Sequence, residues 1–79
     1  MTPKTMLEIV KAIRGNKHAN VMVENASHAE PLAEVIFECR CLYDLLENNA
    51  RLDEVVEQIS KKNEAAKKYE AATGYKWPL

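Results

Sequence analysis

Two histidines and two cysteines are the side chains of this 79-residue chain that most readily bind metals or act as nucleophiles. Cys39 and Cys41 are two residues apart, so on a helix they point about 200° away from each other and can neither form a disulfide together nor bind one metal ion. His18 and His28 match no recognised zinc spacing, and the two glycines are isolated, which excludes a phosphate-binding loop. We therefore expect no catalytic site, no metal and no cofactor, and a protein that is not an enzyme.

The cysteines also indicate a cellular compartment. Two free thiols are typical of a reducing environment, so we expect a cytoplasmic protein. A redox role or an intermolecular disulfide through Cys41 is the alternative. No apolar run approaches the roughly 18 residues that cross a membrane, and Glu8 and Lys11 interrupt the N-terminal apolar stretch, which excludes a signal peptide.

The acidic residues of the middle of the chain offer one further kind of chemistry. Residues 30–37 (EPLAEVIF), 52–57 (LDEVVE) and 61–64 (KKNE) together resemble the second half of the all-α nucleotide pyrophosphohydrolases of the MazG type. The resemblance implies Mg²⁺ held by two paired acidic motifs on facing helices. Glu34 matches one acid of the second motif, Pro31 stands in place of the other, and the upstream ExxE motif is absent. A degenerate enzyme of this type is therefore an alternative rather than the main expectation.

The net charge of −1 hides an uneven distribution. Residues 1–20 carry +3, residues 21–57 carry −7 and residues 58–79 carry +3. An acidic middle disfavours a phosphate backbone, so nucleic-acid binding is not expected. A ribbon–helix–helix DNA-binding dimer is nevertheless an alternative, because residues 20–25 could form a short strand that pairs with a second chain.

The pattern of apolar residues predicts an all-α fold, a small bundle of three to four helices in one domain over 1–79. We expect helices at about 3–14, 29–48 and 50–73, and a short helix at 17–27 for which a strand is the alternative. Thr2-Pro3 and Gly15-Asn16 bracket the first helix, and Ser27 with Glu30 has the spacing of a capping box before the central one. Residues 74–79 form an aromatic C-terminal tail, whose Trp77 either plugs the end of the bundle or enters a pocket of a partner.

The predicted central helix has two apolar stripes. The broad stripe, at spacings typical of a core-facing helix, comprises Leu32, Val35, Ile36, Cys39, Leu42, Tyr43 and Leu46. The narrow stripe comprises Phe37, Cys41 and Leu45, with Glu34 and Glu38 along one side. Because one stripe faces the chain's own core, the other is free to face a second chain.

These patterns favour a function by contact. We expect a small protein-interaction module, a regulator, inhibitor or adaptor, and a homodimer that self-associates or binds another protein. Such stand-alone helical proteins include many encoded by phages and mobile elements, so a viral protein fits the pattern. The residues expected to bind a partner are Phe37, Cys41, Leu45, Glu34, Glu38 and Trp77.

Overall fold

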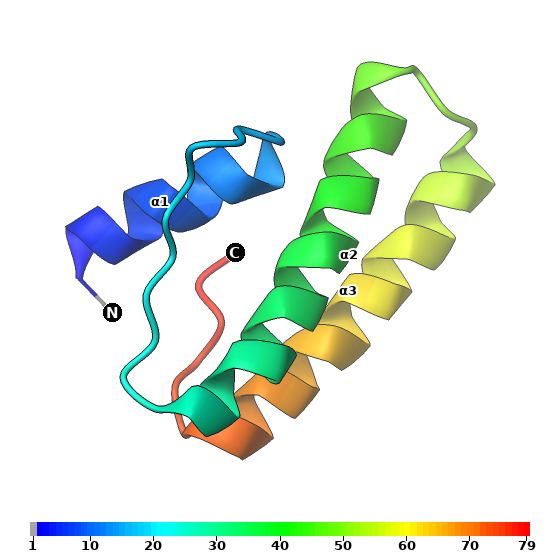
Figure 1. The fold of residues 1–79 in the computed structure, drawn as a ribbon. Helices are drawn as coiled ribbons and strands as arrows, with labels where there is room; N and C mark the ends of the chain where they lie inside the picture. Colours follow the sequence, from blue (N-terminus) through cyan, green and yellow to red (C-terminus); the bar gives the residue numbers. More distant parts are fainter. Residues whose placement is uncertain (1) are drawn as a thin grey trace.

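Three α-helices and one 3₁₀ turn form the regular structure of residues 2–79, the part of the chain that the computed structural model describes (Figure 1). The elements in chain order are α1 (Pro3–Ile13), η1 (Ala26–His28), α2 (Ala29–Glu47) and α3 (Leu52–Thr73). The described residues contain no strand. The predicted all-α fold is confirmed, and the ends of the three long helices lie within two residues of their predicted positions.

Local capping explains where α1 begins and where α1 and α3 end. The Thr2 hydroxyl accepts a hydrogen bond from the Thr5 backbone N–H at 3.2 Å and so caps the first turn of α1. Gly15 (φ +82°) follows α1 and Gly74 (φ +77°) follows α3, each in the left-handed region that glycine adopts without steric cost. These signals are local, which is why the sequence predicts both helices well.

α2 and α3 form an antiparallel helical hairpin, which is the frame of the molecule (Figure 1). Its turn contains Asn49 in the left-handed region at φ 52°. The side-chain amide of Gln58, buried at 8% exposure, donates to the backbone carbonyl of Glu38 at 2.9 Å. The bond gives this buried polar group a partner across the two helices.

The segment between α1 and α2 contradicts the helix predicted over 17–27. Residues 17–25 form neither helix nor strand, and only η1 at 26–28 is helical. Asn16 and Asn25 accept hydrogen bonds from the backbone N–H groups two residues further on, at 2.8 and 3.0 Å, and such turns compete with a helix. Asn25 also caps η1, in place of the capping box predicted from Ser27 and Glu30.

The same segment runs extended across the bundle. Its side chains alternate, with Val21 and Val23 packed against the core and Met22 between them 76% exposed. This alternation is typical of extended backbone. The strand that a ribbon–helix–helix dimer requires at 20–25 is not present, and two of its apolar side chains are already used inside the chain.

The core lies where α1, the C-terminal tail and the hairpin meet. Ile9 of α1 and Val35 of α2 are fully buried. Trp77 of the tail is 6% exposed and meets Tyr69 edge-on, with ring centroids 5.4 Å apart. The tail therefore folds back onto the bundle, the first of the two arrangements expected for it. The remaining buried core residues are Leu32, Cys39 and Ala65.

Candidate functional site

The largest group of exposed apolar side chains on the hairpin lies near its turn. We call this group the open face; it comprises Leu46 at the end of α2 and Leu52, Val56 and Ile59 in the first half of α3, with exposed fractions of 58, 78, 57 and 39%. Residues 52, 56 and 59 have the i, i+4, i+7 spacing of one helical face. Isolated exposed apolar residues are ordinary, but four from adjacent turns of two helices form a candidate contact surface.

The open face arises because neighbouring elements cover only part of the hairpin. The turn end of the hairpin extends beyond both α1 and the C-terminal tail (Figure 1). The buried residues of α3 are Gln58, Ala65 and Tyr69, so burial is concentrated toward its second half. The apolar stripe of α3 is strongest in the first half of the helix. The more apolar half of α3 is therefore the half without a cover.

The narrow stripe predicted on α2 is only partly available. Phe37 is 62% exposed, whereas Cys41 and Leu45 are half-buried. Phe37 borders a shallow groove between α2 and the end of α1, next to Ile36 and Arg40. The stripe is thus one exposed aromatic side chain beside a groove rather than a continuous apolar surface.

The two glutamates beside that stripe take part in contacts within the hairpin. Glu34 forms an ion pair with Lys68 at 3.3 Å, and the backbone carbonyl of Glu38 accepts the Gln58 bond. Both side chains of the Glu34–Lys68 ion pair are exposed, so the pair contributes at most about 1 kcal/mol to the stability of the fold. Trp77 is buried within the chain itself, so its contact with a partner stays a prediction.

The two cysteines are free thiols. Burial raises the pKa of the Cys39 thiol. Burial and the neighbouring Glu38 also raise the pKa of Cys41. A raised pKa keeps a thiol protonated at neutral pH, whereas a nucleophile or metal ligand acts as the thiolate. Their environments therefore fit core packing.

Two further kinds of site are absent from residues 2–79. No three His, Cys, Asp or Glu side chains gather closely enough to hold a metal ion. None of the described helices combines the length and apolarity that a membrane-crossing segment requires.

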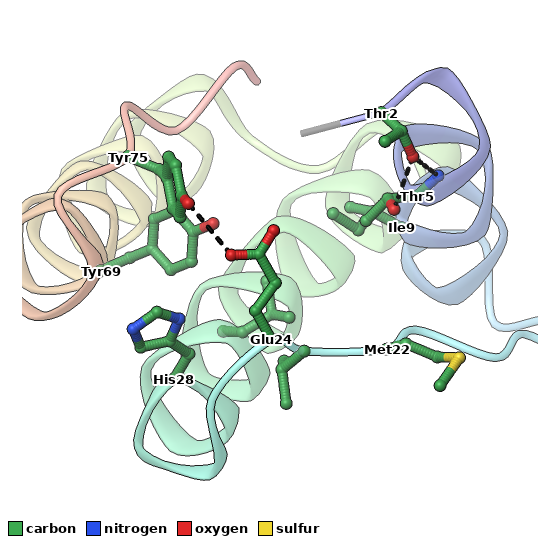
Figure 2. Close-up of a pocket in the computed structure, with 10 residues that line it drawn as sticks. Thr2, Thr5, Ile9, Met22, Glu24, His28, Tyr69 and Tyr75 are labelled. Carbon is green, nitrogen blue, oxygen red and sulfur yellow. Dashed lines mark hydrogen bonds between the residues drawn. The ribbon is translucent and has the colours of Figure 1, made fainter.

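A cavity of about 120 Å³ lies on the side of the bundle where α1 begins (Figure 2). Ile9, Val23 and Leu32 line it with apolar side chains. Its polar lining comes from five parts of the chain. The residues are Thr5 of α1 with its N-cap Thr2, Glu24 of the connecting segment, His28 of η1, Tyr69 of α3 and Tyr75 of the tail. No sequence pattern indicates this site, because its residues are up to 73 positions apart in the chain.

Comparison with known proteins adds no relative: no family model, no curated protein and no solved structure matches the chain.

Proposed function

We propose that this protein is a non-enzymatic interaction module, a regulator, inhibitor or adaptor that acts by binding a protein surface through its open face. The observation that carries the proposal is the exposure of Leu52 and Val56, at 78 and 57%, in the more apolar half of α3. The partner is a second copy of the chain or a different protein with a complementary apolar patch. A cytosolic setting is part of the proposal, because both cysteines are free.

The energetics indicate how large the contact must be. Full burial of a Leu, Val or Ile side chain contributes about 1.5–3 kcal/mol, so covering the exposed parts of the open face contributes roughly 3–7 kcal/mol. Association costs about 4–15 kcal/mol in lost translational and rotational freedom. A stable complex therefore requires contacts beyond the four apolar side chains, and the acidic residues around the turn favour a partner with basic residues at its rim.

The test compares two substitutions with matched exposure on different faces of the hairpin. Val56→Glu places a charge in the open face, and Phe37→Glu places one on α2 beside the groove next to the end of α1, at 57 and 62% exposure. Sedimentation equilibrium over a range of concentrations measures self-association of each variant. We expect Val56→Glu to reduce it and Phe37→Glu to leave it unchanged. The converse result would move the interface to the Phe37 stripe and contradict the open-face proposal.

A monomeric wild-type protein directs the test to a different partner. A photoreactive residue introduced at position 56 is then expected to cross-link to a partner in the native cells, and the same residue at position 37 serves as the matched control. Equal cross-linking from both positions would contradict a specific role of the open face.

A further inference from the structure

One solvent-exposed carboxylate without a cationic partner, that of Glu24, lines the cavity beside α1. In Figure 2 Glu24 lies between the aromatic side chains Tyr69, Tyr75 and His28 on one side and the two threonines on the other. Among residues 2–79 the four ion pairs involve other acids, and none involves Glu24. Its polar contact is the Tyr75 hydroxyl, which donates to Oε2 at 3.1 Å and leaves Oε1 free. The cavity therefore has a net negative charge.

The other polar atoms of the cavity are mostly hydrogen-bond acceptors or hydroxyls. The Thr2 and Thr5 hydroxyl oxygens lie 2.9 Å from each other, and the Tyr69 hydroxyl points toward Glu24 (Figure 2). No lysine or arginine lines the cavity. An anion would find no lysine or arginine here and only the imidazole of His28, whereas a cation would find a carboxylate and several oxygens.

Aromatic rings form a second element of the cavity. Tyr75 and His28 meet at 85° with ring centroids 6.4 Å apart, so the two rings form a corner. The Tyr69 ring, 4% exposed, is held in place by Trp77 behind it. The π faces of tyrosine attract cations within about 6 Å, and quaternary ammonium ions are bound in this way.

We propose that this cavity binds a small organic ammonium ion, with Glu24 as the counter-charge and the rings of Tyr69 and Tyr75 as walls. The volume of about 120 Å³ holds several water molecules, which limits the ligand to a small amine or a compact ammonium head group. Ile9, Val23 and Leu32 provide the apolar surface against which the methylene or methyl groups of such a ligand pack. The site is independent of the open face, because none of its lining residues belongs to that surface.

The test titrates three probes into the full-length protein and follows backbone amide signals by NMR at constant ionic strength. Choline and ethanolamine carry the ammonium group, and 3,3-dimethylbutan-1-ol is the uncharged isostere of choline. We expect the two ammonium probes to bind at least tenfold more tightly than the alcohol and to shift the signals of residues that line the cavity. Tighter binding of choline than of ethanolamine would indicate that contacts with the aromatic rings contribute most to the affinity. Tighter binding of ethanolamine would indicate that hydrogen bonds to its ammonium group contribute most.

Two matched variants locate the site. Glu24→Gln removes the charge with little change in shape and is expected to weaken binding of the ammonium probes at least tenfold. Glu64→Gln removes an exposed charge of α3 away from the cavity and is expected to leave binding unchanged. Equal binding of the alcohol and choline, signal shifts outside the cavity, or equal binding by the Glu24→Gln variant would each overturn the proposal.

Discussion

Replacement of Trp77 by alanine tests whether the C-terminal tail is part of the core. The side chain is 6% exposed and meets Tyr69 edge-on at 5.4 Å and 77°. Truncation of a buried Trp to Ala costs about 3–5 kcal/mol, and the aromatic pair alone accounts for about 0.5–1.5 kcal/mol of such a loss. We expect Trp77→Ala to lower the free energy of unfolding by about 3 kcal/mol. This is a large share of the roughly 4–12 kcal/mol expected for a chain of this size.

Phenylalanine at the same position separates packing from polarity. The Trp77 indole Nε1 is buried without a hydrogen-bond partner, a state that costs about 1–3 kcal/mol. Trp77→Phe removes this unpartnered group and keeps an aromatic ring against Tyr69. The free energy gained in this way offsets part of the packing energy lost with the smaller ring. We therefore expect Trp77→Phe to lower the free energy of unfolding by about 1 kcal/mol or less, clearly less than the alanine variant does.

The assay is urea unfolding followed by far-ultraviolet circular dichroism, because Trp77 is the single tryptophan and its fluorescence is lost in both variants. Leu79→Ala is the matched control, since this residue belongs to the same tail and is 49% exposed. A loss in Trp77→Ala no greater than in Leu79→Ala, or below about 1 kcal/mol, would refute the assignment of Trp77 to the core.

Two further predictions concern a helix end and a pH dependence. Gly74 has φ +77° with no atom near the position of a Cβ, so Gly74→Ala should cost about 1 kcal/mol through backbone strain alone and lower the Tm by about 4–8 °C in a thermal scan. A variant as stable as wild type would show that this conformation is not required. The Asn20 backbone N–H and Lys11 hold the pKa of Glu8 below its ordinary value of 4.5. The stabilisation of the folded state by ionised Glu8 is therefore complete above that pH, and it is lost as the pH falls through the lower pKa of the folded state. Glu8→Gln should therefore reduce the fall in Tm between about pH 5 and pH 3, and an unchanged pH profile would contradict this role.

Much of the fold is predictable because short-range signals decide it. Thr2-Pro3 begins α1, glycines follow α1 and α3, and the apolar period of 3.6 identifies the long helices. The segment 17–27 shows where this approach fails. Ala19, Met22, Val23 and Ala26 have helical spacing. The side chains of Asn16 and Asn25 nevertheless accept hydrogen bonds from the backbone N–H groups two residues further on, and residues 17–25 form no helix.

The candidate site was less predictable than the fold. Phe37 is exposed as expected of the narrow stripe, whereas Trp77 is buried and Glu34 pairs with Lys68. The open face was visible in the sequence only as the stripe of Leu52, Val56 and Ile59, which has the spacing of a core-facing helix. A stripe of this kind does not indicate whether another part of the chain covers it.

The sequence by itself determined that this protein is all-α, where its three long helices begin and end, and that its chemistry-bearing side chains have no recognised catalytic spacing. Only the tertiary structure decided that α1 and the tail cover one end of the hairpin, that Leu52 and Val56 stay exposed, and that Glu24 and Tyr75 meet 51 residues apart in the chain. The physical reason is the distance along the chain over which each kind of interaction acts. Caps and periodicity act over a few residues, whereas the coverage of a helical face depends on the lengths and paths of segments elsewhere in the chain.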